Sequence, residues 1–167
     1  MSDYQSGYHC ADYYYSPHHY LPHHSPMVMV DEVVRVDQNS ACCRVRVSRD
    51  GILGPFLNAE GNLPAWFGIE IIAQTVGVWA GWHHRQHQDE KPRPGMLLGG
   101  RGYRSQQDAF PAGALLEVNV TLLMRDDKIG SFDGDILIAG DVFASGRVNT
   151  YQPDETELQR LLEQGND

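Results

Sequence analysis

The chain has few of the residues that would fix a fold by covalent or metal chemistry. It holds three cysteines, which cannot all pair within one chain. Cys42 and Cys43 are neighbours in a strand-like stretch, so their side chains should point to opposite faces. Neither a disulfide framework nor a zinc-type spacing follows, and this cysteine usage favours a reducing environment.

Positive charge is also scarce. Lys and Arg number 13 against 22 Asp and Glu, which gives a formal net charge of −9. A general nucleic-acid binder usually carries a basic surface, so this composition argues against that class. The first residues have neither the basic segment nor the apolar core of a secretory signal. We therefore expect a cytoplasmic protein.

A long, uninterrupted apolar run is missing as well. Residues 65–82 come nearest to one and have about the length of a short membrane span. Glu70 and Gln74 lie inside this run, and a carboxylate there would be costly in lipid. A helix buried inside a soluble fold explains the same residues at lower cost.

The two ends of the chain differ from its middle. Residues 1–16 hold five tyrosines and neither Lys nor Arg, which predicts a flexible N-terminal arm. Residues 153–167 form an acidic tail, whose leucine spacing allows a short amphipathic helix. Between them, residues 17–152 predict one globular domain.

The middle of the chain combines strand signals with one long helix. The predicted helix covers about residues 65–88, with Pro64 suited to its first turn, and is apolar on nearly every side, which is typical of a buried helix. The predicted strands cover residues 27–36, 41–49, 96–105 and 114–125, with two more within 134–149. This order predicts an α+β fold, in which an antiparallel sheet wraps around one long central helix. A sheet this small leaves an edge strand, so we expect at least a dimer.

Three stretches of the sequence carry a family resemblance. They are LPHHSPMVMVDEV (21–33), LPAWFGIEIIAQ (63–74) and MLLGGRGYRSQQDAFPAGALLEV (96–118). In this order and spacing they resemble the β-hydroxyacyl-ACP dehydratases of bacterial fatty acid synthesis, and more closely the dehydratase-like subunits of aryl polyene pathways. The resemblance implies a hotdog fold and the dehydration of a 3-hydroxyacyl thioester, carried on an acyl carrier protein, to the trans-2-enoyl thioester. It implies no cofactor and no metal.

One residue of the family pattern is missing. Those dehydratases place a catalytic histidine in a His-Phe-Pro-Gly loop shortly before the helix, whereas the matching loop GPFLNAEGNLPAW (54–66) contains none. Two other functions therefore stay open. One is a catalytically weakened hotdog subunit that serves as the partner of an active homologue. The other is a hotdog acyl thioesterase, in which Glu70 would activate water.

Dehydration needs a base for the C2 proton, an acid for the leaving hydroxyl, and donors for the thioester oxygen. Glu70 is the candidate acid: its apolar neighbours favour the neutral, proton-donating form, the positive end of the helix opposes this, and the role requires that desolvation outweighs the helix end. Gln74 lies one turn later on the same helix face and could orient it. His23 takes the family's Pro-His position as candidate base, with His24 as the weaker alternative. Structural roles for Glu70 and His23 also remain open, and the resemblance implies that the two meet across a dimer interface.

The resemblance also assigns residues to substrate binding. Backbone N–H groups at the helix start, at Ala65, would stabilise the thioester oxygen. In the following strand, Leu98, Gly99 and Gly100 would leave room for the acyl or pantetheine chain. The alternative for the two glycines is a β-bulge.

A local cluster of positive charge stands out in this acidic chain. Residues 91–107 contain Lys91, Arg93, Arg101 and Arg104 and no acid. Because carrier proteins are generally acidic, this cluster predicts a docking surface for an acyl carrier protein. Ordinary strand and loop charge is the alternative.

Two histidines of the predicted helix are candidate metal ligands. His83 and His87 share one helix face, as zinc ligands sometimes do. No cysteine or carboxylate completes a site at a recognisable spacing. We therefore interpret them as solvated surface histidines.

Overall fold

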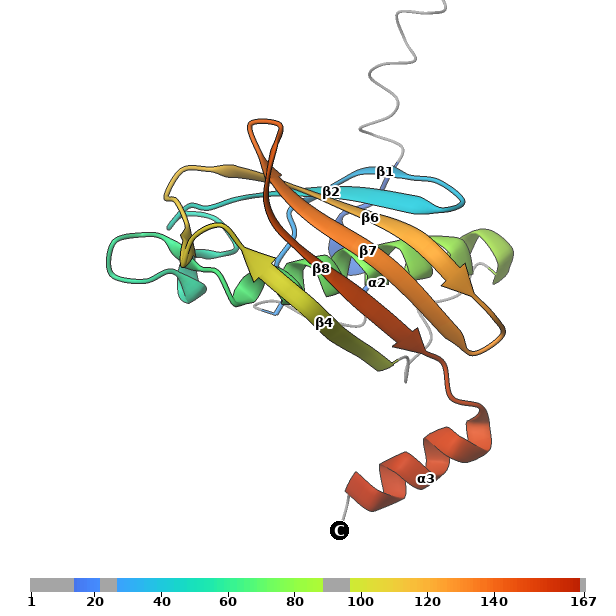
Figure 1. The fold of residues 1–167 in the computed structure, drawn as a ribbon. Helices are drawn as coiled ribbons and strands as arrows, with labels where there is room; N and C mark the ends of the chain where they lie inside the picture. The colour runs from blue at the N-terminus through green and yellow to red at the C-terminus, as the bar shows by residue number, and fades with distance from the viewer. Residues whose placement is uncertain (1–13, 22–26, 89–96, 166–167) are drawn as a thin grey trace, which may run out of the picture.

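A six-stranded antiparallel sheet forms the body of the computed structural model, which describes residues 14–21, 27–88 and 97–165 (Figure 1). Its strands are β1 (Glu32–Val36), β2 (Ser40–Arg46), β4 (Leu97–Ser105), β6 (Leu115–Arg125), β7 (Ile129–Ile138) and β8 (Asp141–Tyr151). Their order in space is β1-β2-β6-β7-β8-β4. Strands β1 and β4 are therefore the two edges of this sheet.

A period of two separates the faces of the sheet. In β6, buried residues alternate with exposed or partly exposed ones. In β2, Cys43 pairs with Val118 and is fully buried, while the thiol of Cys42 lies 3.7 Å from Glu117 Oε1. Both cysteines are free thiols, and burial raises the pKa of Cys43 to about 12. The predicted split of the pair to opposite faces agrees with this register.

Two strand boundaries differ from the prediction. Strand β1 begins at Glu32 rather than at residue 27, because the backbone of Met27 and Met29 bonds to the Gln74 side chain of the helix instead of to a strand. Strand β7 begins at Ile129 rather than at residue 134. There the carboxylate of Asp126 accepts the backbone N–H groups of Lys128 and Ile129 and closes a tight turn.

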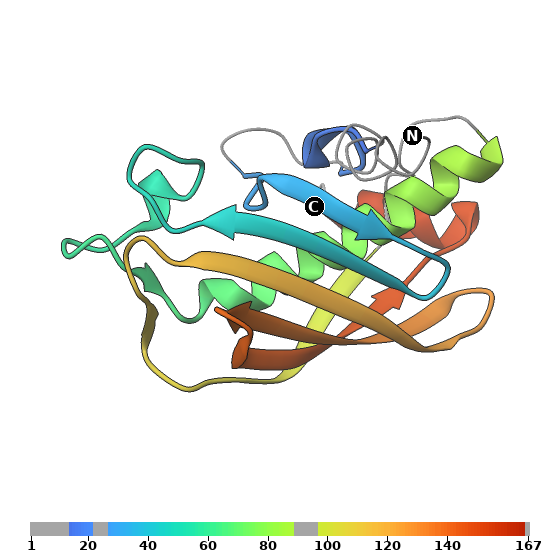
Figure 2. The same cartoon turned by 90° about the horizontal axis from the view of Figure 1, so that it is seen from above.

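One long helix, α2 (Phe67–Gln88), crosses the inner face of the sheet (Figure 2). It follows the short strand β3 (Leu63–Pro64), which pairs with β5 (Ala109–Phe110). Pro64 thus belongs to a strand and not to the first helical turn, contrary to the prediction. Gly134 of β7 lets the sheet come close to the helix, because a Cβ there would overlap the side chain of Ile72. The predicted sheet wrapped around one central helix is confirmed.

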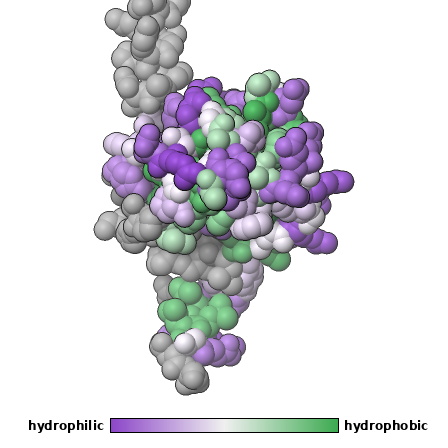
Figure 3. Space-filling view, turned by 90° about the vertical axis from the view of Figure 1, so that its left-hand side faces the viewer, coloured by the Kyte–Doolittle hydropathy of each residue, from purple (hydrophilic) through white to green (hydrophobic). Residues whose placement is uncertain are grey.

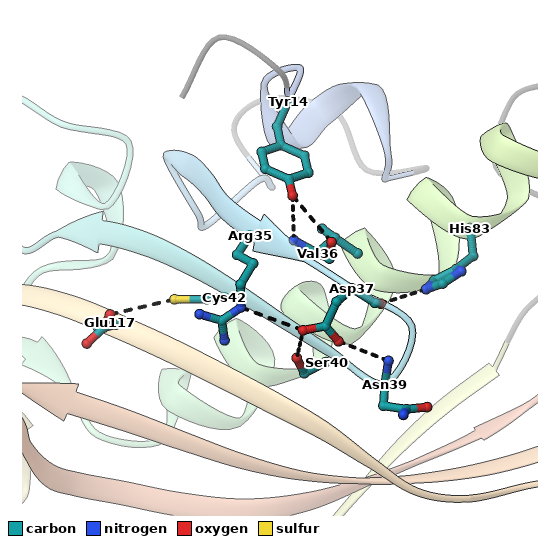
Figure 4. Close-up of polar contacts among 9 residues, drawn as sticks. All are labelled: Tyr14, Arg35, Val36, Asp37, Asn39, Ser40, Cys42, His83 and Glu117. Atoms are coloured by element: carbon teal, nitrogen blue, oxygen red, sulfur yellow. Dashed lines mark hydrogen bonds and ion pairs between the residues drawn. The ribbon is translucent and has the colours of Figure 1, made fainter. Parts of the chain in front are cut away.

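The segment before β1 packs against the C-terminal half of α2. It includes the 3-10 helix η1 (Pro17–His19) and Tyr20. The carbonyl of Tyr20 lies so close to Gly81 of the helix that a Cβ at Gly81 would overlap it. Tyr14 accepts a hydrogen bond from Val36 N (3.1 Å) and donates one to Val36 O (3.3 Å) (Figure 4). Tyr14, assigned to the flexible arm in the prediction, therefore contacts the folded domain. Residues 1–13 of that arm lie outside the described residues.

The acidic tail contains a helix, α3 (Glu155–Gly165). It follows β8 and projects beyond β4, away from the sheet (Figure 1). Across the three described ranges, none of the helices combines the length and the apolar character needed to span a membrane.

Candidate active site

Two polar side chains on α2 bond to each other one turn apart. Glu70 lies in the first turn of the helix and is partly buried. Gln74 donates from Nε2 to Glu70 Oε1 at 3.2 Å. Gln74 is only 1% exposed, so its amide has to find its partners inside the protein. The geometry therefore suits Gln74 to orient the Glu70 carboxyl.

Gln74 also bonds to a segment far away in the sequence. Its Oε1 accepts the N–H of Met29, and its Nε2 donates to the carbonyl of Met27, both at 2.7 Å. One amide group therefore connects Glu70 to the backbone of Met27 and Met29, which follow His23 and His24 in the sequence. The candidate bases His23 and His24 themselves lie outside the described residues, and their placement stays a prediction.

The helix start is held by three hydrogen bonds at Ala65. Its N–H donates to Asp108 O at 2.8 Å, and its carbonyl accepts from Gly68 N at 2.9 Å and from the Tyr103 hydroxyl at 2.6 Å. The predicted use of the Ala65 N–H for the thioester oxygen is therefore wrong in this conformation, because pairing with the β4–β5 connection already occupies that donor. The N–H groups of Trp66 and Phe67 follow it at the positive end of the helix.

Tyr103 is a site residue that the sequence analysis missed. A bulge between Arg101 and Arg104, with Gly102 at a φ of 65°, turns its side chain toward the helix. Its ring fits there because residue 68 is a glycine, where a Cβ would overlap the Tyr103 hydroxyl. Burial raises the pKa of Tyr103 to about 12. The sequence signal was weak: a tyrosine directly after Gly102 in a predicted strand rich in glycine.

The glycines assigned to a substrate channel have different surroundings. Gly100 pairs with Val148, and a Cβ at Gly100 would overlap Ile69 of α2. The helix thus fills the space predicted for a ligand, and that assignment is wrong for Gly100. Gly99 is exposed and has no atom near the position of a Cβ. Leu98 is partly buried and packs against the core.

In the structure, the predicted positive cluster lies beside acidic residues of neighbouring strands. Arg101 and Arg104 are exposed on β4, whereas Lys91 and Arg93 lie outside the described residues. Arg101 and Arg104 border a hollow of about 440 Å³ on the sheet. Residues of β7 and β8 line the rest of it: Asp133, Gly134, Asp135, Ser145, Gly146 and Arg147. Arg147 pairs with Asp133 at 3.3 Å, and no ion pair is formed by Arg101 or Arg104 within the described ranges. Arg101 and Arg104 at the sheet edge are thus without an ion-pair partner among the described residues.

His83 has a structural role rather than that of a solvated surface residue. Its Nε2 bonds to the carbonyl of Asp37 at 2.9 Å (Figure 4). The centroid of its ring lies 4.4 Å from that of Trp79. It thereby holds the β1–β2 turn on the helix, which corrects the prediction. The side chain of His87 lies outside the described residues. Among those that the structure does describe, no three potential ligands come together in a way that could hold a metal ion.

Solved structures of low identity define the class. An uncharacterized protein, PH1136, from Pyrococcus horikoshii is 10% identical, with a TM-score of 0.61 over 82% of this chain and 93% of that chain. A hypothetical thioesterase with coenzyme A from Streptococcus pneumoniae TIGR4 is 11% identical, with a TM-score of 0.56 over 72% of this chain and 83% of that chain. At such identities the similarity concerns the fold alone, and this fold is the hotdog fold.

Two closer matches define the family. The ApeP-like family, described as ApeP dehydratase, matches residues 15–163. The dehydratase heterocomplex ApeI:P from Xenorhabdus doucetiae contains a chain that is 48% identical, with a TM-score of 0.82 over 89% of this chain and 98% of that chain. The chain therefore belongs to the ApeP-like dehydratase family. A comparison with curated proteins gave no match.

Proposed function

We propose that this protein removes water from a 3-hydroxyacyl thioester on an acyl carrier protein, in fatty acid or aryl polyene chain building. The observation that carries the proposal is the bonding of Gln74. Its single buried amide orients Glu70 and holds the backbone that follows His23. An acid and a base supplied by these two segments are what dehydration requires.

In the proposed reaction, His23 takes the C2 proton and its electrons form the C2–C3 double bond. The C3–O bond breaks, and the hydroxyl leaves as water with a proton from Glu70. The trans-2-enoyl thioester and water are the products. His23 is then protonated and Glu70 ionised, and transfer of one proton from His23 to Glu70 restores the starting state.

The thioester oxygen gains negative charge as C2 loses its proton. We assign its stabilisation to the backbone N–H groups of Trp66 and Phe67 at the start of α2. The helix end is positive there, and the bonds to Asp108 and Tyr103 fix the backbone at Ala65 immediately before them. No cofactor enters this chemistry.

The partners follow from the edge of the sheet and from its charge. Strand β4 has one neighbour, β8, so its outer backbone groups suit pairing with a second hotdog subunit, identical or related. The exposed Arg101 and Arg104, with Lys91 and Arg93 before them, suit an acidic carrier protein in the cytoplasm. If so, Arg101→Glu with Arg104→Glu raises KM for the carrier-bound substrate at low salt and leaves kcat unchanged.

A second function has specific support. The loop of residues 54–66 has no histidine, and the 48% identical chain was solved within a dehydratase heterocomplex. Both observations favour a weakened subunit that supports an active homologue. In that case the isolated protein would be well folded and inactive.

The test is mass spectrometry of a 3-hydroxyacyl carrier-protein thioester incubated with the purified protein. Three variants are compared with it: Glu70→Gln, His23→Ala and, as a control on an exposed loop, Glu60→Gln. We expect loss of water with the native protein and the control, and none with the first two variants. Dehydration that survives His23→Ala would remove the base from the mechanism. No reaction by a folded native protein would support the partner-subunit function, and release of free acid would support a thioesterase.

A further inference from the structure

The outer face of the sheet, which is turned away from α2 and toward the viewer in Figure 1, carries the hollow described above. The glycines of its strands show which side chains point into it. A Cβ at Gly134 of β7, Gly146 of β8 or Gly100 of β4 would meet side chains of α2. These positions face the helix, so their neighbours in each strand point outward. Six outward side chains therefore share this face: Asp133, Asp135, Ser145, Arg147, Arg101 and Arg104.

The pairing of the strands arranges these side chains in two rows. The register gives the rows as Asp133–Arg147–Arg101 and Asp135–Ser145–Arg104. Both rows run from an acid on β7, across β8, to a base on the edge strand β4. Since neighbouring strands lie about 4.8 Å apart, roughly 10 Å separates the acid from the base at the two ends of a row. The hollow thus has an acidic end and a basic end.

The basic end has an excess of positive charge. Arg147 lies 3.3 Å from Asp133, which leaves Arg101 directly opposite a second guanidinium. Like charges directly opposite each other in a sheet are destabilising. Arg104, at the end of the other row, forms no ion pair in the described part of the chain either. A negative charge brought to this end from outside would therefore be favourable.

The acidic end disfavours such a charge. Burial and the charge of Asp133 raise the pKa of Asp135, so negative charge is already crowded along β7. A negatively charged partner surface is therefore attracted over β4 and β8 and repelled over β7. This contrast would fix where a partner lies on the face, because complementary charges set the register of a contact.

The outer face stays accessible when β4 pairs with another subunit. The backbone groups of an edge strand lie in the plane of the sheet, whereas its side chains stand roughly perpendicular to it. A second hotdog subunit along β4 would therefore extend the sheet without covering Arg101 or Arg104. Hydrophilic side chains also cover much of the end of the domain at which β4 finishes (Figure 3). At that end Tyr103, next to Arg104, bonds to the start of the helix that carries Glu70.

We propose that the hollow between β4, β7 and β8 is a docking site for the acidic surface of an acyl carrier protein. Arg147 binds that surface together with the two arginines of β4, and Asp133 competes with it for Arg147. The inference rests on the carrier-bound substrate proposed above. An acidic side chain of the carrier protein between Arg101 and Arg147 relieves the repulsion between them. Asp133 weakens docking and so favours release of the product.

The experiment measures the dissociation constant of a fluorescently labelled apo carrier protein by anisotropy at low salt. The apo form has no pantetheine arm, so its binding reports docking and not occupation of the active site. Arg147→Gln should weaken binding about fivefold, and Asp133→Asn should strengthen it by about the same factor because Arg147 is released. Arg160→Gln removes the same charge at an exposed position of α3 and should change nothing. Circular dichroism verifies that every variant is folded.

Three results would overturn the inference. An unchanged dissociation constant for Arg147→Gln, or weaker binding by Asp133→Asn, removes the hollow from docking even if the arginines of β4 contribute. Effects seen only with the holo carrier protein assign the arginines to the phosphate of the pantetheine arm. Failure of both the native protein and Asp133→Asn to bind the apo form removes the docking site altogether. A protein that binds the carrier protein but does not dehydrate its substrate contradicts the proposed reaction and leaves this inference standing.

Discussion

The two ends of α2 use polar side chains in different ways. At the N-terminal end, Glu70 and Gln74 bond to each other and onward to the backbone after the Pro-His stretch. In the C-terminal half, the indole N–H of Trp79 is buried without a hydrogen-bond partner among the described residues, and His83 holds the β1–β2 turn. A connected polar group beside a helix N-terminus is equipped for chemistry, because its groups are oriented and the helix end favours negative charge. The other end is equipped only to keep the sheet and helix together.

This contrast makes a general prediction. Substitutions at the start of α2 should change the reaction rate, with or without a change in stability. Substitutions at its far end should change stability alone.

Gln74→Met is expected to have the largest effect, because it should lower both the stability and the dehydration rate. Methionine fills the space but leaves the N–H of the buried Met29 unpaired and Glu70 without its orienting donor. The free energy of unfolding should fall by about 2–4 kcal/mol, and the dehydration rate per folded molecule should fall as well. Urea unfolding and the carrier-protein assay measure the two. Thr75→Val, a neighbouring buried position bonded to Ile71 O, is the control and should leave the rate intact.

Next in size is Gly81→Ala at the other end of the helix. Alanine normally favours a helix, but here its Cβ would overlap the backbone of Tyr20, which cannot move away easily. Stability should fall by roughly 1–3 kcal/mol with the rate per folded molecule unchanged. Gly77→Ala meets only the end of the Leu21 side chain and should cost less. Equal losses in thermal unfolding for both variants would contradict the backbone contact.

A smaller effect is expected for Tyr103→Phe, which removes only the hydrogen bond to Ala65 O. The loss of stability near pH 7 should be about 1 kcal/mol, with a lower kcat because the proposed donors for the thioester oxygen are less well fixed.

The same variant has a signature at high pH. Because the pKa of Tyr103 is raised to about 12 from an ordinary 10, its contribution to stability is complete below pH 10 and is lost as the pH rises toward 12. The variant should therefore lose less stability over that range in circular dichroism, while Tyr15→Phe, at an exposed ring, should behave as the native protein does. Cys42 and Cys43 account for part of the remaining loss, since burial raises their pKa values to about 11 and 12.

The smallest effect is expected for Trp79→Phe. It removes a buried N–H that finds no partner in the described part of the chain, and this gain offsets the loss of ring volume and of the contact with Arg125. Stability in urea should stay within about 1 kcal/mol of the native value, with an unchanged rate. A large loss of activity would show that the two ends of α2 are not as separate as we describe.

Part of the fold and of the candidate site could be predicted from the sequence, because it depends on local pattern. The alternation of the strands and the apolar character of α2 predicted the sheet and its central helix. The leucines of the tail predicted a short amphipathic helix, which is present. Spacing alone placed Glu70 and Gln74 on one helix face, since residues four apart are neighbours on any α-helix.

Other predictions were wrong because they concern features that depend on how closely distant segments approach one another. Gly99 and Gly100 suggested an open channel, but Ile69 fills the space beside Gly100. Ala65 had an unpaired N–H by its position at the helix start, but Asp108, 43 residues later, takes it. Periodicity carries no information about which loop reaches a helix end.

The sequence by itself determined the kind of fold, the family, and a carboxylate–amide pair at the start of a buried helix. Only the tertiary structure decided which groups surround that pair: the backbone of Met27 and Met29 bonds to Gln74, and nearby the hydroxyl of Tyr103 bonds to Ala65 at the helix start. It also decided that Leu161 and Leu162 of α3 are exposed within the described part of the chain. The physical reason is that these contacts are set by the register of β4 on β8 and by the distance between sheet and helix. Both are fixed by packing between segments far apart in the chain, which no local pattern records.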